Sequence, residues 1–283
     1  MEQKSKKIPV AIIGANGYTG IELVRILLEH PHAELTTITS RQYEGKKLAD
    51  IFPNFQGHSD LSFEAMQIKN IAKKNQAIFL CLPHHQSMEI AAKFRKHAVK
   101  VIDLSADFRF SQTRVYEKVY GKHTQKQLNR SSSYGLCEIF SEEIKQSHLI
   151  GVPGCYVTSI LLALAPLLQN QLIIPNNIIC DSKSGSSGAG RSAKVDQLLA
   201  ESYGNFKAYG IGNHRHRPEI EEKLSLLASD KVKISFTPHL LPISRGILST
   251  CYAQPIRKWN NKKLTDVFRK FYQRSPFVKV VDS

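Results

Sequence analysis

The chain has 283 residues, of which 42% are apolar, and this is enough to fill the cores of about two domains of roughly 100 to 200 residues each. Charged residues make up 22%, which argues against a disordered chain, and no apolar run reaches the roughly 18 residues of a membrane span. The net charge of +15 is scattered, without a dense tract or an aromatic RNA-binding signature, so it favours a protein that handles small anionic substrates, or merely a soluble protein, over one that binds nucleic acid.

Five cysteines, at positions 81, 137, 155, 180 and 251, form no Cys-x-x-Cys pair, and their number is odd. This pattern argues against a disulfide framework or a zinc site and for a reducing compartment. The N-terminal lysines are followed by an apolar run that stops at Gly14, which is not the pattern of a signal peptide. We therefore expect a cytoplasmic protein without a membrane partner or a resident metal.

The first element pattern is a β-branched apolar run at Ile8–Gly14, typical of a buried parallel strand, followed by the turn GANGYTG and a helical pattern over Ile21–Leu28. Strand, glycine-rich turn and helix form the context that a dinucleotide-binding fingerprint requires. Gly14 permits the tight turn, Gly17 lets the backbone approach a pyrophosphate, and Gly20 lets helix and strand pack closely. The spacing G-x-x-G-x-x-G departs from the commoner G-x-G-x-x-G.

The next predicted strand, Glu34–Thr39, ends in Ser40 and Arg41. An acidic residue near this place accepts hydrogen bonds from the ribose of NAD, whereas an arginine suits the 2′-phosphate of NADP. These two residues therefore favour NADP. The alternative interpretation is that Arg41 is an ordinary solvated loop residue.

Two further strands are predicted at Ala77–Leu82 and Val99–Leu104, with a helix at Met88–Lys96 between them. Alternating strands and helices predict right-handed crossovers and a doubly wound parallel sheet. The loops after these strands lie on the cofactor side of such a sheet, so we expect Pro83 at the nicotinamide end and the segment Asp103–Arg109 at the substrate mouth. The adjacent histidines after Pro83 are interpreted as loop residues and not as metal ligands.

Gly151–Ser159 is the stretch around which the second half is organised, and the apolar run that follows it to Leu168 predicts a buried helix. Cys155 lies at or beside the first turn of that helix. Unpaired backbone N–H groups and the positive end of the helix dipole favour a thiolate there, which makes Cys155 a candidate nucleophile. The alternative is a small buried apolar cysteine.

After this helix the strand candidates are longer and partly alternating, which predicts a largely antiparallel sheet; they cover residues 177–181, 232–238 and 246–254. Between the first two lies a small-residue loop at residues 182–191 that runs into a helix predicted from Ser192. The loop is either a flexible linker or a second close approach to an anion or to the nicotinamide.

The segment GNHRHRPEIEE at residues 212–222 places two histidines and two arginines just before a predicted helix. Histidine titrates near neutrality and can carry the proton that a cysteine nucleophile requires, while arginine attracts an anionic substrate. One of these histidines can meet Cys155 in space although the two are distant in sequence. The alternative is a polar surface segment.

Together these motifs resemble the N-acetyl-gamma-glutamyl-phosphate reductase family, within the wider aspartate-semialdehyde dehydrogenase-like group. The matching stretches occur in the family's order over nearly the whole chain: GANGYTG, TSR, LSADFR, YGLCE, PGCY, SGSSGAGR, HRHRPEI and PHLLPISRGILST. The PGCY stretch favours the arginine-biosynthesis branch over the aspartate-semialdehyde branch.

The resemblance implies an NADPH-dependent acyl-phosphate reductase with Cys155 as the nucleophile and His216 as the acid/base. It implies a Rossmann-type domain at residues 1–148 and an α+β catalytic domain at residues 149–283. Substrate contacts are implied for Arg109, Tyr209, His214 and Arg245. Cofactor contacts are implied for Gly14, Asn16, Gly17, Tyr18, Thr19, Gly20, Ser40, Arg41, Pro83, Ser184, Gly185 and Gly188.

The resemblance also implies a small acyl phosphate or aldehyde substrate and a homo-oligomer, a dimer or a tetramer. Related acyl-phosphate reductases that act on aspartyl or carrier-linked aminoadipyl phosphates remain alternatives, as does an NADP-binding protein without full activity. Members of the family continue beyond the region of residues 276–278 into a segment that returns to the cofactor domain, whereas this sequence stops at Ser283. We therefore expect a fragment or a truncated product.

Overall fold

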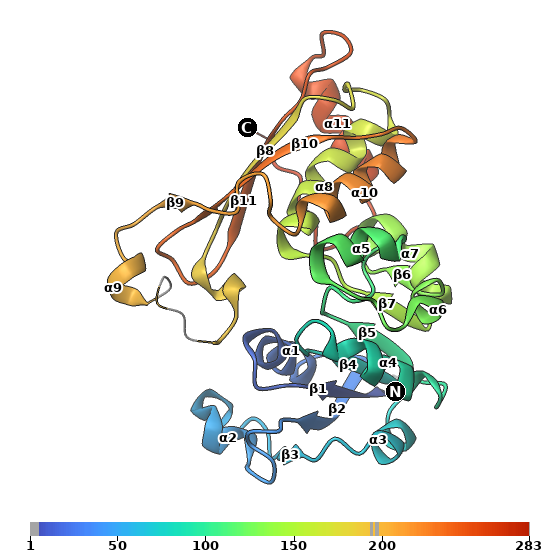
Figure 1. Cartoon of the computed structure of the whole chain (residues 1–283), viewed down its shortest axis with the longest axis vertical. Helices are drawn as coiled ribbons and strands as arrows, with labels where there is room; N and C mark the ends of the chain where they lie inside the picture. Colours follow the sequence, from blue (N-terminus) through green and yellow to red (C-terminus); the bar gives the residue numbers. More distant parts are fainter. Residues whose placement is uncertain (1–5, 193–194, 196–197, 283) are drawn as a thin grey trace, which may run out of the picture. The chain divides into compact units, whose positions relative to one another are not determined.

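The computed structural model describes residues 6–192, 195 and 198–282 (Figure 1). The chain divides into two compact units. The N-terminal unit extends to Gly135 and also contains Glu142–Val152, and the C-terminal unit contains Leu136–Ser141 and the chain from Pro153 onward.

The N-terminal unit is built on a sheet of seven strands, all paired in parallel, in the order β3-β2-β1-β4-β5-β7-β6. From β1 the chain runs outward to β2 and β3, and it then returns to β4 on the other side of β1. The direction in which strands are added therefore reverses between β1 and β4. The strands are β1 (Ile8–Ile13), β2 (Ala33–Thr39), β3 (Phe63–Glu64), β4 (Ala77–Leu80), β5 (Lys100–Asp103), β6 (Ser133–Tyr134) and β7 (Leu149–Gly151).

Both faces of this sheet are buried, as the continuous apolar run of β1 predicts. Val10 and Ile12 pack into one core cluster with Val24 of α1, whereas Ala11 and Ile13 pack into a second cluster on the other face. The fold is therefore the doubly wound α/β sheet expected from the sequence. Its helices are α1 (Tyr18–Leu28), α2 (Leu48–Ile51), α3 (Ile68–Lys74), α4 (Gln86–Arg95), α5 (Thr113–Tyr120) and α6 (Lys126–Asn129), with a 3-10 turn η1 (Pro53–Phe55).

The chain passes from one unit to the other within helix α7 (Cys137–Gln146). Phe140 in this helix has non-helical backbone angles, φ −116° and ψ 33°, so the helix is kinked. Phe140 lies in the segment of α7 that belongs to the C-terminal unit, two residues before Glu142, where the N-terminal unit resumes.

The C-terminal unit contains a mixed four-stranded sheet in the order β11-β8-β10-β9. Two of its three strand pairs are antiparallel, as expected, but β8 and β10 run parallel to each other, which the sequence analysis did not predict. The reason is a crossover: the chain between them contains helix α10 (Arg217–Ala228), and parallel neighbours require such a connection. The strands are β8 (Ile178–Ser184), β9 (Lys207–Ala208), β10 (Ile234–Leu240) and β11 (Ile247–Tyr252).

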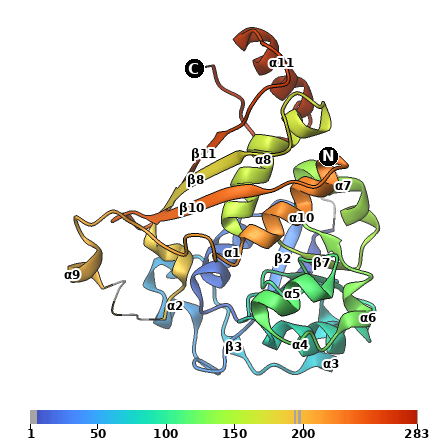
Figure 2. The same ribbon diagram turned by 45° about the horizontal axis from the view of Figure 1, so that its top comes forward.

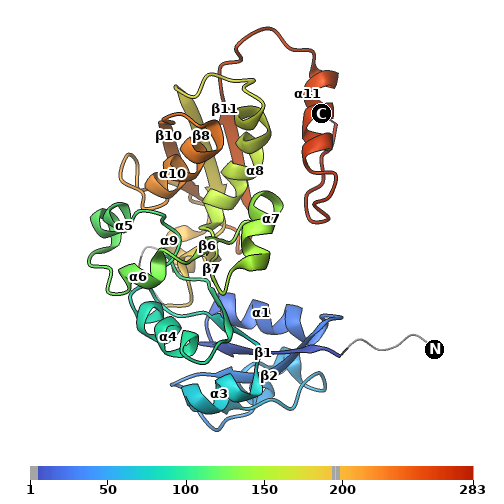
Figure 3. The same cartoon turned by 90° about the vertical axis from the view of Figure 1, so that its right-hand side faces the viewer.

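Helices α8 (Cys155–Gln169) and α10 (Arg217–Ala228) cover one face of this sheet, as Figure 2 shows. The helix expected from Ser192 begins among residues that lie partly outside the described ones, and the first described helix in this region is α9 (Leu199–Ser202), after the 3-10 turn η2 (Ser186–Ala189). Helix α11 (Asn261–Phe271) follows β11 through a connecting loop (Figure 3).

Helix α8 continues through Pro166, although a proline removes one helical hydrogen bond. The carbonyl group that loses its donor is that of Leu162, four residues earlier. The hydroxyl group of Tyr272 donates to this carbonyl oxygen at 2.6 Å, and the tyrosine is almost fully buried. Tyr272 therefore stabilises helix α8 at the turn where Pro166 removes a hydrogen bond.

No helix in the described part of the chain is long and apolar enough to cross a bilayer.

Candidate active site

The glycine-rich turn between β1 and α1 has the geometry that its sequence predicts. Gly14 has a φ of +86°, and a Cβ atom on it would lie 2.6 Å from the carbonyl oxygen of Cys81. A Cβ atom on Gly20 would lie 2.6 Å from the carbonyl oxygen of Gly14, so only glycine lets α1 pack this closely on the turn. A Cβ atom on Gly17, in contrast, would meet nothing within 4 Å.

The amino end of α1 is open to a ligand. Gly17 is its N-cap, no side chain caps the first turn, and Tyr18 and Thr19 are exposed. The turn itself is fixed to the end of β2, because Gly14 donates to the hydroxyl oxygen of Thr39 at 3.2 Å and Ala15 donates to the Thr39 carbonyl at 2.9 Å. Free backbone space, N–H groups and a positive helix end are the features that a dinucleotide pyrophosphate requires, so this turn fits the cofactor.

Ser40 and Arg41 follow β2 directly, at the same carboxyl edge of the sheet as the glycine turn. Ser40 is buried, and its hydroxyl oxygen accepts a hydrogen bond from the backbone N–H of Tyr43 at 3.3 Å. Arg41 is exposed and donates to the side chain of Gln86 at 2.8 Å. An exposed guanidinium group held beside the end of β2 suits the phosphate of NADP.

The loop after β4 contains Pro83, which is exposed, and two histidines, of which His84 bonds through its ring and His85 through its backbone N–H. The imidazole Nδ1 of His84 accepts from the N–H of Ala106 at 2.9 Å, and the N–H of His85 donates to the carboxylate of Asp107 at 3.0 Å. These contacts tie the loop after β4 to the loop after β5. They agree with the interpretation of the pair as loop residues, and in the described residues no group of three or more potential metal ligands comes together.

Arg109, predicted to contact the substrate, is 7% exposed. Its guanidinium group donates to the carbonyl oxygens of Val152 at 2.6 Å and Leu104 at 3.0 Å. These two contacts hold the end of β7 against the end of β5, immediately before the segment that leads to Cys155. The observed contacts are thus structural.

Cys155 is the first residue of α8 and is exposed, whereas the residues on both sides of it are buried. Gly154 is the N-cap in an extended conformation, and no side chain caps this helix end. The sulfur therefore lies where the first backbone N–H groups and the positive end of the helix dipole act, as predicted.

His216 contacts Gly154, the residue that precedes Cys155. A Cβ atom on Gly154 would lie 2.7 Å from Nε2 of His216, so the imidazole ring rests directly on the backbone of Gly154. Any larger residue at this position would displace the ring. His216 is 8% exposed and is the N-cap residue of α10.

Glu219 fixes the same segment and was not assigned a role from the sequence. It is fully buried in the first turn of α10, three residues after His216, and its Oε1 accepts a hydrogen bond from the N–H of Gly154 at 3.0 Å. Residues three apart lie on one face of a helix, so α10 presents both side chains to Gly154. This spacing is the signal that could have identified Glu219.

Tyr156 was also missed, and it organises the aromatic surroundings of the site. Its hydroxyl group contacts the hydroxyl groups of Ser184 at 2.7 Å and Tyr209 at 2.9 Å. Its ring packs edge-on against His214 and His216, with centroid distances of 5.7 and 6.0 Å. Burial raises the pKa of Tyr156 well above its ordinary value, so it remains a neutral hydrogen-bonding group.

His214 supports His216. Its Nδ1 accepts a hydrogen bond from the N–H of His216 at 3.1 Å, and the two rings pack at 4.9 Å. Burial, assisted by the positive charge of Arg215, lowers the pKa of His214 to about 4. His214 is therefore neutral near pH 7 and acts as an acceptor.

The small-residue loop after β8 packs against the loop that contains Arg245. A Cβ atom on Gly185 would lie 2.7 Å from the backbone nitrogen of Arg245, and Gly185 donates to the carbonyl oxygen of Gly246 at 3.0 Å. Gly188 is exposed and has open space around it, and Arg245 is exposed. The two loops therefore form a paired structure and not a flexible linker.

Comparison with known proteins gives the family. Residues 9–147 match the family described as "Semialdehyde dehydrogenase, NAD binding domain", and residues 155–283 match "Semialdehyde dehydrogenase, dimerisation domain". The N-acetyl-gamma-glutamyl-phosphate reductase of Geotalea daltonii is 48% identical over 97% of this chain and 80% of its own length. The chain belongs to the N-acetyl-gamma-glutamyl-phosphate reductase family. The protein of that name from Moorella thermoacetica is 47% identical over the same shares of the two chains.

Solved structures with the same fold include aspartate semialdehyde dehydrogenase II from Vibrio cholerae, with a TM-score of 0.69 at 16% identity, covering 94% of this chain and 79% of that one. The aspartate semialdehyde dehydrogenase from Candida albicans solved with NADP has a TM-score of 0.71 at 13% identity, covering 94% and 76%. The predicted family and fold class are thereby confirmed. The chain is an oxidoreductase whose cofactor is NADP(H). Its C-terminal unit matches a domain family that is described as a dimerisation domain.

Proposed function

We propose that this chain reduces N-acetyl-gamma-glutamyl phosphate to N-acetylglutamate semialdehyde with NADPH, releasing phosphate, as a step of arginine biosynthesis in the cytoplasm. This substrate is named in the names of two relatives, which are 47–48% identical to this chain over nearly its whole length. The observation that carries the proposal is an exposed cysteine at the start of a buried helix, with a buried histidine resting on the preceding glycine.

Cys155 starts the reaction as the nucleophile. Its thiolate attacks the carbonyl carbon of the acyl phosphate, the bond from that carbon to the phosphate oxygen breaks, and phosphate leaves with the electron pair. The product is a thioester on Cys155. The first N–H groups of α8 that lack a helical acceptor, such as those of Tyr156 and Val157, lie where an oxyanion on the reacting carbon develops.

His216 is the proton carrier of the second half of the reaction. NADPH, when bound, supplies the hydride that reduces the thioester carbon. His216 gives a proton to the oxygen of the resulting hemithioacetal and takes it back when the carbon–sulfur bond breaks, so that the aldehyde forms and Cys155 leaves as a thiolate. Tyr156 and His214 hold the imidazole ring, and Glu219 holds the backbone before the nucleophile.

Residues 1–148 are assigned to cofactor binding and residues 149–283 to catalysis and substrate binding. The turn from Gly14 to Gly20 holds the pyrophosphate, Ser40 and Arg41 hold the 2′-phosphate, and Pro83, Ser184, Gly185 and Gly188 contact the nicotinamide half. Arg245, Tyr209 and His214 bind the substrate carboxylate or phosphate. For Arg109 the two carbonyl contacts favour an indirect role, in which it shapes the substrate mouth.

The protein works as a homodimer or homotetramer formed through the face of the C-terminal sheet that α8 and α10 leave uncovered. Ile179 and Tyr252 lie opposite each other on this face, and Leu248 lies on the same face of β11. These side chains are 48%, 57% and 65% exposed. Exposed apolar side chains gathered on one sheet face are typical of a protein interface.

The test is oxidation of N-acetylglutamate semialdehyde by the chain with NADP⁺ and phosphate, followed at the nicotinamide absorbance. We expect a rate that requires phosphate, and we expect Cys155→Ser to retain NADPH binding while losing turnover by a factor of about 10³ or more. Cys137→Ser, which removes another exposed cysteine, is the matched control and should remain active.

Two outcomes would overturn the proposal. Retained turnover in Cys155→Ser would remove the nucleophile assignment. A phosphate-dependent rate with aspartate semialdehyde or a carrier-linked aminoadipate semialdehyde, and none with N-acetylglutamate semialdehyde, would replace the substrate.

A further inference from the structure

Cys180 and Cys251 form a pair of cysteines outside the active site. They lie directly opposite each other on the antiparallel strands β8 and β11. Cys180 is completely buried, and Cys251 is half-buried. Because residues in register on neighbouring strands point to the same face of a sheet, both side chains face the helices that cover it.

The backbone positions suit a disulfide bond. Opposite residues of antiparallel strands have Cα atoms about 4.5 to 5.5 Å apart, and disulfides span Cα separations of about 4.4 to 6.8 Å. The two thiols are close enough for each to shift the pKa of the other. Neither strand has to move far for a covalent bond to form.

The two thiols are chemically unequal. The hydrogen bond from Cys180 lowers the pKa of Cys251, and the same hydrogen bond together with burial raises the pKa of Cys180. Burial raises the pKa of Cys81 to about 12, and it also raises the pKa of Cys137. Cys251 is therefore the member of the pair that ionises first, and an ionised sulfur is the reactive form.

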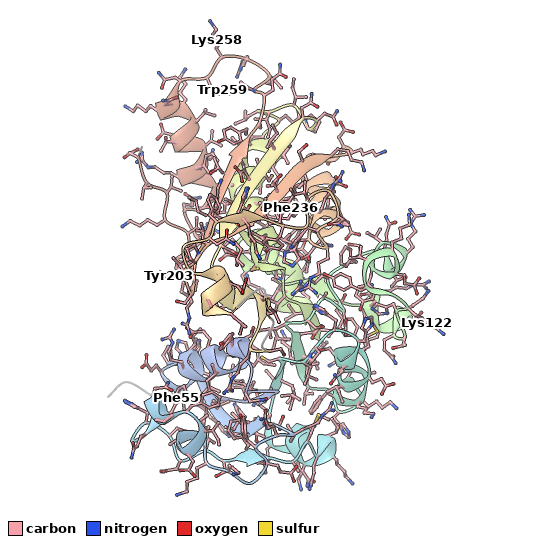
Figure 4. All side chains as sticks on the ribbon, turned by 60° about the vertical axis from the view of Figure 1, so that its left-hand side comes forward. Phe55, Lys122, Tyr203, Phe236, Lys258 and Trp259 are labelled. Atoms are coloured by element: carbon pink, nitrogen blue, oxygen red, sulfur yellow. The ribbon has the colours of Figure 1, made fainter. Side chains whose placement is uncertain are left out.

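Cys251 also borders a space that a small oxidant can occupy. A cavity of about 390 Å³ lies between α8, β11 and α11, and Cys251 lines it together with Leu164 and Phe268. Trp259 lines the same cavity from the segment that precedes α11 (Figure 4). The buried indole N–H of Trp259 meets no acceptor among the described residues, so it can donate to an oxygen atom of a small guest.

We propose that Cys251 and Cys180 are a peroxide-oxidised pair, in which Cys251 reacts with hydrogen peroxide from the cavity and Cys180 closes a disulfide across β8 and β11. Cys251 sulfur attacks one peroxide oxygen, the O–O bond breaks, and the leaving hydroxide takes a proton to become water. Cys180 sulfur then attacks the sulfenic sulfur, the S–O bond breaks, and a second water leaves. The two thiols lose two electrons, and the peroxide gains them.

The position of the pair connects it to the nucleophile helix. Two residues away from the cysteines on each strand, the hydroxyl groups of Ser182 and Ser249 contact each other at 2.7 Å. Ser249 in turn contacts Ser159 of α8 at 2.7 Å, four residues after Cys155. A covalent bond between β8 and β11 therefore forms next to the contacts that seat this helix on the sheet.

The experiment uses the full chain with Cys155→Ser, so that the exposed active-site thiol does not react and the result is independent of the proposed function. The protein is treated with hydrogen peroxide, the remaining thiols are alkylated, and peptides are analysed by mass spectrometry. We expect a dithiothreitol-reversible link between the peptides that carry Cys180 and Cys251. Before oxidation, Cys251 should be alkylated on the order of tenfold faster than Cys180.

Two single substitutions in the Cys155→Ser chain test the order of events. With Cys180→Ser, oxidation should stop at a sulfenic acid on Cys251 that dimedone traps, and with Cys251→Ser, Cys180 should remain alkylatable. Thermal unfolding checks that both variants are folded, and Cys137 is the internal control because it has no cysteine partner across a strand. The proposal is wrong if Cys180 and Cys251 remain alkylatable at a peroxide dose that oxidises Cys155 in the unsubstituted chain.

Discussion

Glu219 fixes the backbone immediately before Cys155, the proposed nucleophile. Its buried carboxylate holds the N–H of Gly154, and the carbonyl of Gly154 accepts the N–H of Thr158 in the first turn of α8. Cys155 lies between these two fixed points. A carboxylate at this place therefore sets where the helix begins and where the sulfur lies.

This contact predicts a difference between two substitutions. Glu219→Ala removes the acceptor of a buried N–H and should lower the free energy of unfolding by about 1 to 3 kcal/mol and kcat by roughly tenfold to a hundredfold. Glu219→Gln keeps an oxygen acceptor and should retain most of both. Urea unfolding, kcat against KM, and the rate of Cys155 alkylation measure these effects.

The control for Glu219 is Asp266→Ala, which removes an exposed carboxylate of α11 that contacts Arg269 and should change nothing. Equal kcat values for Glu219→Ala and the unsubstituted chain would show that the carboxylate does not position the nucleophile.

His214 predicts a pH dependence of stability. Its folded-state pKa, lowered from 6.5 to about 4, means that the unfolded chain binds a proton more readily between these two values. The contribution of His214 to the free energy of unfolding is then fully present above pH 6.5 and is lost as the pH drops toward 4. We expect His214→Gln to reduce the loss of unfolding free energy between pH 7 and pH 4.5, whereas the surface variant His97→Gln should retain it. An unchanged loss in His214→Gln would contradict the lowered pKa.

At the residue scale, the sequence predicted the groups with distinctive chemistry and missed those that position them. Cys155 directly follows Pro153 and Gly154, His216 lies two residues before Pro218, and both carry reactive side chains. Glu219 is one of several acidic residues at the start of α10, and only its burial against Gly154 separates it from its neighbours. Tertiary contacts of this kind leave no local pattern.

At the scale of elements, two glycines of the β1–α1 turn have different roles, one in folding and one in the proposed cofactor binding. Gly20→Ala places a Cβ atom 2.6 to 2.7 Å from the backbone of Gly14 and Ala15 and should destabilise the fold by about 1 to 3 kcal/mol. Gly17→Ala meets open space and has an ordinary φ of −78°, so it should fold normally.

In the cofactor site proposed above, the methyl group of Gly17→Ala would instead occupy space assigned to the pyrophosphate. We expect a roughly tenfold weaker NADPH affinity, about 1.4 kcal/mol, with an unchanged melting temperature. NADPH fluorescence titration and thermal unfolding of both variants measure the two effects. If Gly17→Ala bound NADPH normally, the pyrophosphate would not approach this turn.

The elements that the sequence predicted well are those with strong local signals, such as the apolar run of β1 and the glycine turn after it. β6 and β7 have two and three residues, too few for any periodic pattern, and their exchanged order in the sheet is a tertiary property. The parallel pairing of β8 and β10 was missed because alternating burial does not report strand direction. That direction follows from α10, which brings His216 and Glu219 to Gly154.

At the scale of the whole molecule, the proposed assembly rests on the uncovered face of the C-terminal sheet. Ile179, Leu248 and Tyr252 expose apolar area on β8 and β11, and the side chains on the other face of β8 are buried. Leaving this area in water is unfavourable by about 25 cal/mol per Å², so association that covers it is favoured. An assembly would also protect β11, which is an edge strand.

We therefore expect Leu248→Lys to lower the mass measured by light scattering at micromolar concentration, because a charge in the centre of the interface must lose its water. Leu226→Lys is the matched control: this leucine is 61% exposed, but it lies on α10, which covers the opposite face. It should leave the mass unchanged. A smaller mass in both variants would indicate general destabilisation, and an unchanged mass in Leu248→Lys would show that the chains associate elsewhere.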